Sequence, residues 1–202
     1  MSEANLPAQW IDKLAIGEVV QSWALWRDTG NWDGLRRAFH PDGTMTATWF
    51  TGGVEDFIAG CQRSWAAGSR SGHFIGGTVV QLKAAKAIAE SRLILMVRDV
   101  VDDVEVDVTC YGRFYDRFVK TPEGWRILQR GVVYEKDRLD PVRPDATLKL
   151  DEAILKRFPE GYRHVAYVQT KRGLKVAPDR PTPRSPELER LTRDAQAWLA
   201  GP

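Results

Sequence analysis

The sequence has few of the residues that build disulfide frameworks and metal sites. Its 202 residues include two cysteines, Cys61 and Cys110, and three histidines, and none of these falls at a Cys-x-x-Cys or Cys/His ligand spacing. Such spacings mark most recognisable zinc and redox sites. A glycine-rich phosphate-binding loop is missing as well. We therefore expect free thiols and a protein that uses neither a metal nor a cofactor.

Long apolar runs and an excess of one charge are also missing. The 29 basic and 27 acidic residues are scattered and give a net charge of +2, so no basic stripe is available for nucleic acid. No apolar stretch approaches the ~20 residues needed to cross a bilayer. Residues 1–13 lack the charged start and the apolar run of a signal peptide. We expect a cytoplasmic protein that binds neither nucleic acid nor a membrane.

Tryptophan, in contrast, is abundant, with eight residues in 202. Large aromatic side chains usually belong to the core, which is our interpretation for Trp32 and Trp125. Five aromatic residues are instead candidate walls of a cavity for a flat ligand: Trp23, Trp26, Trp49, Phe50 and Phe114.

The first seventy residues predict three helices and one short strand. An apolar stripe at helical spacing, stopped by Thr29-Gly30, predicts the first helix, and Asn31 can cap the second. The helices are expected at 10–28, 32–38 and 54–65, and the strand at 44–50. Asp28 misfits locally, because a carboxylate in the last turn meets the negative end of the helix dipole. Local misfits of this kind are typical of functional sites.

From residue 73 the pattern changes to period two. It predicts four long antiparallel strands joined by short turns, at 73–82, 87–98, 104–118 and 125–135. In the third strand Cys110 shares the apolar face, which is core or cavity. Tyr111, Arg113 and Tyr115 share the opposite face, which is polar surface or subunit contact. Neither face of the fourth strand is plainly apolar, so periodicity does not place Arg130.

Beyond residue 140 the composition changes to proline-punctuated sequence, and we divide the chain into a domain at 1–140 and an extension at 141–202. The extension predicts a short helix at 150–158, a proline-rich linker at 178–186 and an amphipathic helix at 186–199. The apolar face of this last helix must be buried on its own domain, over a pocket mouth, or on a second subunit.

Of the three histidines, only His73 stands among small and apolar neighbours, in the run Gly-His-Phe-Ile-Gly-Gly-Thr. Histidine is the side chain best suited to move protons near neutral pH. His73 and Asp28 are therefore the leading candidates for chemistry. An Asp28 that pairs with Arg27 or Arg36 at the surface is the alternative. The other two histidines, in a turn and in the tail, are interpreted as solvated or capping residues.

Helices followed by a curved four-stranded antiparallel sheet resemble the cone-shaped α+β barrel of the SnoaL-like branch of the NTF2-like superfamily. The resemblance covers about residues 11–137. Within the superfamily, the sequence resembles the scytalone dehydratases and the bile acid 7-alpha-dehydratases. It rests on Ser22-Trp23-Ala24, Asp28, Trp32-Asp33, Leu35-Arg36, Pro41 and the run from His73 to Thr78. The fold class that it implies is α+β, a curved antiparallel sheet packed on N-terminal helices, here with a C-terminal extension.

The resemblance implies that Asp28 and His73 form an acid/base pair inside the cone. It also implies that Arg130, Val132 and Tyr134 of the last strand line the pocket. Since a buried arginine without a partner is costly, Arg130 must pair with Asp28 or another acid, or meet an anionic or phenolic ligand oxygen. We expect the ligand oxygen. An Arg130 that braces a nearby acid of its own strand is the alternative.

Several positions depart from the family pattern. Arg27 and Ala47 stand where the dehydratases have tyrosines, and Val97 where they have a second histidine. Trp23 replaces a tyrosine of the bile acid dehydratases, so scytalone itself is not the expected substrate. Beside the catalytic set, we predict these substrate-binding residues: Trp23, Trp26, Arg27, Trp49, Phe50, Val97, Cys110, Phe114 and Val132.

We interpret the chain as a cofactor-independent lyase that acts on a small hydroxylated aromatic or polycyclic compound, by loss of water or a related retro-aldol-type elimination. His73 would take the proton and Asp28 would orient its ring, while Arg130 and Tyr134 would stabilise the oxyanion. A ketosteroid-type isomerase and a non-catalytic small-molecule-binding module are the alternatives. The dehydratases are trimeric, which implies a homo-oligomer, a trimer rather than a dimer.

Overall fold

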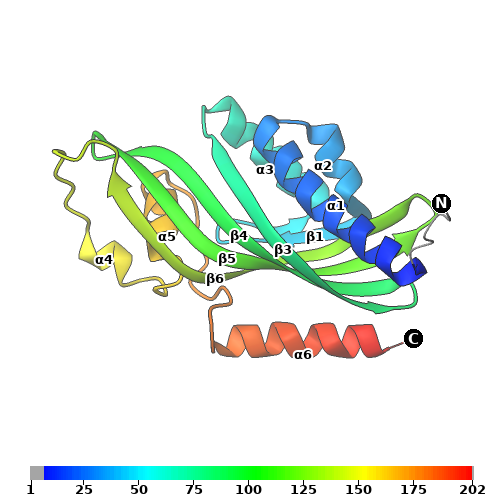
Figure 1. The fold of residues 1–202 in the computed structure, drawn as a ribbon. Coiled ribbons are helices and arrows are strands. Elements are labelled where there is room, and N and C mark those ends of the chain that lie inside the picture. Colours follow the sequence, from blue (N-terminus) through cyan, green and yellow to red (C-terminus); the bar gives the residue numbers. More distant parts are fainter. Residues whose placement is uncertain (1–6, 202) are drawn as a thin grey trace, which may run out of the picture.

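The computed structural model describes residues 7–201 as a strongly curved, unclosed six-stranded sheet with helices on both faces (Figure 1). The expectation that residues 1–13 are not a signal peptide falls partly on residues 1–6, which lie outside the described residues. The helices are α1 (Ala8–Thr29), α2 (Trp32–Ala38), α3 (Val54–Ala66), α4 (Glu152–Leu155), α5 (Arg163–Lys171) and α6 (Pro186–Ala200). The strands are β1 (Phe39–Thr46), β2 (Thr51–Gly53), β3 (Ser71–Lys83), β4 (Lys86–Val101), β5 (Val104–Thr121) and β6 (Gly124–Pro141). The expected α+β fold is confirmed.

The first three helices form where local chemistry predicts them. Gly30 ends α1 with a φ of +73°, the left-handed conformation that glycine adopts without strain, and its N–H bonds to the Trp26 carbonyl. The Asn31 side chain then caps α2 by accepting from the Gly34 N–H at 2.9 Å. In Figure 1 α1, α2 and α3 lie together on the inner, concave face of the sheet.

The sheet runs in the order β2-β1-β6-β5-β4-β3. The strands β3 to β6 are consecutive antiparallel hairpins, as expected, and the β4–β5 turn places Asp102 and Asp103 at φ +48° and +64°. Two successive positive φ values suit the right-handed twist of a tight hairpin. The first strand begins earlier than expected, because Phe39 already pairs in parallel with Ile127 of β6, and the expected turn at residues 40–43 is an irregularity in β1 before Thr44 pairs with Gln129.

The outer face of the sheet carries α6, which lies on the side opposite α1 (Figure 1). Ala195 and Leu199 of α6 pack on Ile88, Tyr115 and Val133. Tyr115 is 3% exposed, so its expected place in a subunit contact is wrong: the chain's own helix covers it. Of the three destinations open to this helix, the structure shows docking on its own domain.

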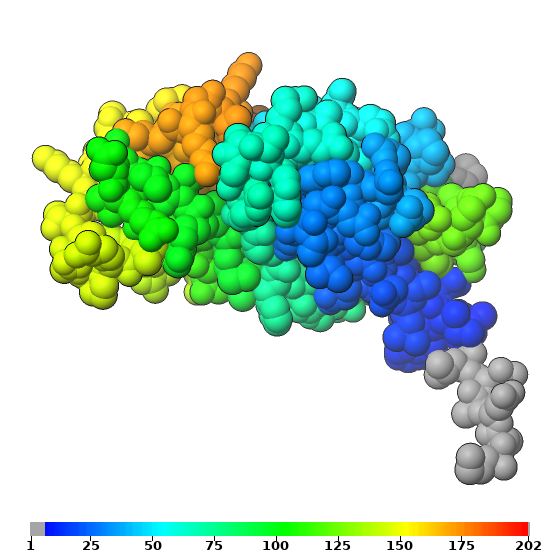
Figure 2. Space-filling model, turned by 90° about the horizontal axis from the view of Figure 1, so that it is seen from above, coloured from blue at the N-terminus to red at the C-terminus, as the bar shows by residue number. Residues whose placement is uncertain are grey.

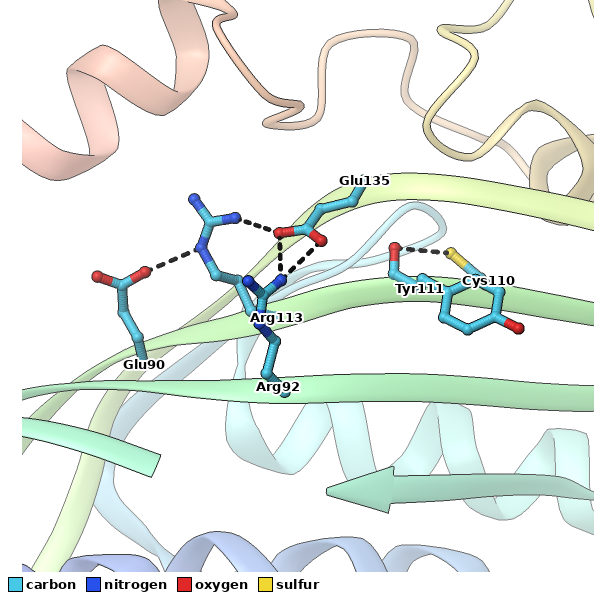
Figure 3. Close-up of polar contacts among 6 residues, drawn as sticks. All are labelled: Glu90, Arg92, Cys110, Tyr111, Arg113 and Glu135. Carbon is cyan, nitrogen blue, oxygen red and sulfur yellow. Dashed lines mark hydrogen bonds and ion pairs between the residues drawn. The ribbon is translucent and has the colours of Figure 1, made fainter. Parts of the chain in front are cut away.

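Arg113, on the same outer face, is held by charge rather than by α6. Its Nε donates to Glu90 at 2.9 Å, its Nη1 donates to Glu135, and Arg92 bonds both oxygens of Glu135 (Figure 3). This network crosses strands β4, β5 and β6. Such a network fixes the register of the three strands on a partly exposed surface.

The helix α5 is not predicted by the sequence and lies at the open end of the sheet. Its first turn is capped by the buried Asp137 carboxylate of β6, which accepts from the backbone N–H groups of His164 at 2.7 Å and Val165 at 2.8 Å. The expected helix at 150–158 is shorter, at Glu152–Leu155. Across residues 7–201, none of the helices has the length and apolar character that a bilayer crossing requires.

Candidate functional site

A cavity of about 750 Å³ lies between the inner face of the sheet and helices α1, α3 and α5. This volume is within the usual range of small-molecule sites. Its buried end is apolar, and six of the predicted aromatic and aliphatic residues line it: Trp23, Trp49, Phe50, Val97, Phe114 and Val132. Four predicted polar residues line it as well: Arg27, His73, Cys110 and Tyr134.

His73 and Asp28 meet at the edge of this cavity. The Nδ1 atom of His73 lies 2.6 Å from Asp28 Oδ1, and the backbone N–H of His73 donates to Oδ2 at 2.6 Å. The side chains are 11% and 18% exposed. The prediction that the two residues lie within hydrogen-bond distance is confirmed. With an ionised Asp28 the ring proton sits on Nδ1, which leaves Nε2 as the basic nitrogen.

Aromatic rings fix the position of the imidazole. Trp23 meets the His73 ring edge-on, with centroids 5.4 Å apart, and meets Phe114 edge-on at 5.0 Å. Trp23 is 1% exposed, and its Nε1 is a buried donor that has no hydrogen-bond partner among residues 7–201. Buried polar groups are normally paired, so a ligand oxygen that reached this N–H would satisfy it.

Tyr134 and Cys110 are buried polar groups on the inner face. The Tyr134 hydroxyl oxygen accepts from the Thr48 N–H at 3.1 Å, and the hydroxyl also interacts with the Thr48 side chain, whose Oγ1 donates to Gln169 at 2.7 Å. Burial raises the pKa of Tyr134 well above its ordinary value, so the phenol stays protonated. Burial, with a smaller effect from Asp137, likewise raises the pKa of Cys110. A protonated thiol is a poor nucleophile, and Cys110 is a lining residue of the apolar wall.

The expectation that Arg130 points at the ligand is wrong. Arg130 is fully buried, does not line the cavity, and donates to both oxygens of Asp116, from Nε at 2.9 Å and from Nη2 at 2.6 Å. The two residues are direct cross-strand partners in β5 and β6. The guanidinium carbon lies 3.9 Å from the Phe114 ring centroid and 4.5 Å from that of Trp23. Arg130 therefore packs against the rings of Trp23 and Phe114, which form the aromatic floor of the cavity.

The expectation that Trp26 forms a cavity wall is also wrong. The Trp26 ring packs on α2, where a Cβ added to Gly34 would come within 2.7 Å of it. The residue does not line the cavity, because it faces the neighbouring helix instead of the sheet. The absence of a side chain at Gly34 is what allows this close contact between α1 and α2.

Sequence reasoning missed the residues that α5 and α3 bring to the cavity. Gln169 and Arg172 come from α5 and its C-terminal end, and Arg63 comes from α3. Arg172 bonds Ser69 at 2.9 Å and pairs with Asp99 at 2.5 Å, joining α5 to the segment before β3, as the adjoining orange and cyan-green regions of Figure 2 show. The buried pair Val165 and Val168, at helical spacing, is the only sequence signal for α5.

A second histidine pair lies beside the site. His164 Nδ1 lies 2.8 Å from Asp137 Oδ1, and the same carboxylate caps α5 by accepting from the His164 N–H, so Asp137 is the capping residue and the expectation that His164 is solvated or capping is wrong. It does not line the cavity. Among residues 7–201, no three His, Cys, Asp or Glu side chains are grouped so as to hold a metal ion.

Comparison with known proteins adds the following. Residues 8–131 match the sequence model of the SnoaL-like domain. A PEP2-like protein of Fusarium vanettenii is 32% identical over 203 residues, which cover 95% of this chain and 87% of that protein. Pea pathogenicity protein 2 of the same fungus is 31% identical over 199 residues, which cover 94% of this chain and 84% of that protein.

Two solved structures have the same fold. A type 2 hexachlorocyclohexane dehydrochlorinase has a TM-score of 0.58 and 10% identity, covering 70% of this chain and 95% of its own. A provisionally named scytalone dehydratase of Novosphingobium aromaticivorans has a TM-score of 0.57 and 16% identity, covering 70% of this chain and 97% of its own. Identities this low show a shared fold and nothing about the reaction.

Proposed function

This chain belongs to the SnoaL-like domain family, and we propose that it is a cofactor-independent lyase acting on a small hydroxylated aromatic or polycyclic compound. The reaction is the loss of water or a related retro-aldol-type elimination. One observation carries the proposal: Asp28 holds both the ring and the backbone of His73 at the edge of a largely apolar cavity. An oriented imidazole with one free nitrogen is the arrangement that general base catalysis requires.

In this proposal Nε2 of His73 removes a proton next to a carbonyl or from a phenol, the C–O bond to the departing hydroxyl breaks, and the imidazolium returns the proton to that hydroxyl, which leaves as water. Asp28 holds the ring and stabilises the imidazolium that forms. Negative charge then develops on a substrate oxygen, and the cavity-lining residues that can donate to it are Tyr134, through its hydroxyl, and Trp23, whose Nε1–H has no partner among residues 7–201. These two donors replace Arg130, which the sequence predicts as a donor to this oxygen. Removing one such donor typically costs ~3 to 4 kcal/mol of transition-state stabilisation.

A ketosteroid-type isomerase is the second candidate. Ala47 and Val97 line the cavity and provide no second proton-transfer group, and an isomerase needs a base but no acid for a leaving group. The mass of the product separates the two reactions, because isomerisation leaves it unchanged.

The test is a screen of phenolic diols and β-hydroxy ketones for a new conjugated absorbance, followed by variants at the pair. His73→Ala should lower kcat by about 100-fold or more with a smaller change in KM. Asp28→Asn should also lower kcat, because an amide no longer stabilises the imidazolium. His40→Ala is the matched control, since His40 lies in β1 away from the cavity and should leave kcat unchanged. Equal losses in the His73 and His40 variants would indicate lost stability and contradict the catalytic role.

A further inference from the structure

The exposed end of the cavity carries more positive than negative charge. Three arginines line it, Arg27, Arg63 and Arg172, against one lining carboxylate, Asp99. Arg172 and Asp99 form an ion pair at 2.5 Å, so their charges balance. Among residues 7–201, neither Arg27 nor Arg63 forms an ion pair with a carboxylate. Two uncompensated guanidinium groups therefore remain in the wall of the cavity.

These two groups gather at one turn of α3. The guanidinium of Arg27, from α1, interacts with the thiol of Cys61 and opposes the rise that burial causes in its pKa. Arg63 Nη2 lies 3.7 Å from the place of a Cβ on Gly60, the residue before Cys61. Two cations that lie at the same turn of a helix repel each other. An anion placed there would relieve it.

The same turn also borders the aromatic wall. The Trp49 ring lies 3.0 Å from the position of a Gly60 Cβ, so the cationic site adjoins a flat apolar surface. On β3, two residues before His73, Ser71 lines the cavity, and its buried hydroxyl has no hydrogen-bond partner within the described part of the chain. The site thus offers two guanidinium groups and an unused hydroxyl beside aromatic rings.

We propose that the substrate is anionic: an aromatic or polycyclic carboxylate whose rings lie on the apolar wall and whose carboxylate binds Arg27 and Arg63. Guanidinium and carboxylate groups match in geometry and form strong charge-assisted hydrogen bonds. This inference rests on the proposed function for its reaction at His73, and it adds the class of compound that the site selects. A neutral phenol would leave the two cations of the wall unpaired.

Binding of a matched pair of probes tests the charge without any turnover. 2-Naphthoate and its neutral analogue 2-naphthamide have the same rings and nearly the same shape, and calorimetry with the full chain measures both affinities. We expect naphthoate to bind at least about tenfold more tightly than naphthamide. Arg27→Gln/Arg63→Gln should bring this ratio close to one. Arg70→Gln is the control: Arg70 stacks on Trp65, does not line the cavity and should keep the ratio.

Arg63→Gln alone keeps the test valid if the double variant is unstable, because Arg63 is exposed and its replacement should reduce the ratio without unfolding the chain. Equal affinities for the two probes, or a ratio that survives both arginine variants, would overturn the anionic substrate. His73→Asn separates this result from the proposed reaction, since loss of the base should leave the ratio intact. A charge preference without elimination activity would support the anion site and refute the lyase. Elimination on neutral substrates alone would support the lyase and refute the anion site.

Discussion

The buried pair of Arg130 and Asp116 gives the sharpest stability prediction. Both side chains are 0% exposed and are joined by two hydrogen bonds. Arg130→Met removes the cation and leaves the Asp116 carboxylate buried without its partner. Breaking a buried pair in this way costs ~3–5 kcal/mol, because the remaining charge keeps its desolvation penalty. For a chain of this size we expect the melting temperature to fall by about 6–20 °C.

The double variant Arg130→Met/Asp116→Leu separates the cost of an orphaned charge from the value of the pair. Replacing both ions by apolar residues of similar volume is often neutral or stabilising. It also removes the Nη1 donor of Arg130, which is buried without a hydrogen-bond partner. Against this stands the loss of the guanidinium contacts with Phe114 and Trp23, worth ~1–2 kcal/mol when desolvated. We therefore expect the free energy of unfolding of the double variant to lie within ~2 kcal/mol of the wild-type value.

Urea unfolding followed by circular dichroism gives the free energies. Arg92→Met is the matched control, because Arg92 is 68% exposed and its pair with Glu135 should be worth less than ~1 kcal/mol. An Arg130→Met variant that loses no more stability than this control would refute the assignment of a fully desolvated pair. A double variant as unstable as Arg130→Met would show that the pair itself, and not the orphaned charge, carries the stability.

Three further predictions concern acid stability, assembly and the helix α6. Asp12 accepts from Lys120 at 2.7 Å and from Trp125 Nε1 at 2.8 Å, and these bonds lower its pKa below the ordinary 3.8. Asp12→Asn should cost about 1 kcal/mol at pH 7, and since the stabilisation is lost as pH falls through the folded pKa, urea curves of variant and wild type should converge as the pH falls below 3.8. We also expect a homo-oligomer, a trimer rather than a dimer; light scattering that gives the 22.8 kDa of one chain at micromolar concentration would contradict this. Truncation after residue 184 removes α6 from Tyr115 and should lower solubility and melting temperature, and an unchanged protein would show that α6 is dispensable.

Most of the fold could be predicted because its signals are local. Apolar periodicity, an Asn cap and a glycine stop define the first helices within one or two residues, and period-two alternation defines the four long strands. What the sequence did not predict depends on distant partners. The strand β1 exists because it pairs in parallel with β6, and α5 begins where Asp137 of β6 caps it.

The candidate site could be predicted in part, for similar reasons. The pair of Asp28 and His73 was identified from a local misfit and a family pattern, and the structure places the two in contact. Arg130 was correctly placed on the inner face, but its acid was missed. Asp116 continues the inward alternation of β5, and a buried carboxylate opposite a buried arginine is a pairing signal that register alone would have revealed.

One part of the cavity lies within the family match and another part comes from the C-terminal extension, and this difference bears on substrate choice. The SnoaL-like match ends at residue 131, so it includes the His73–Asp28 pair and the aromatic floor but not Tyr134 or α5. The fungal relatives, in contrast, align over 94–95% of this chain and so include the extension. The extension places Val165, Val168 and Gln169 in the cavity wall. Substrate preference within this group should therefore vary with the α5 side of the cavity, while under the proposed function the His73–Asp28 pair, which the family match includes, would determine only the class of chemistry.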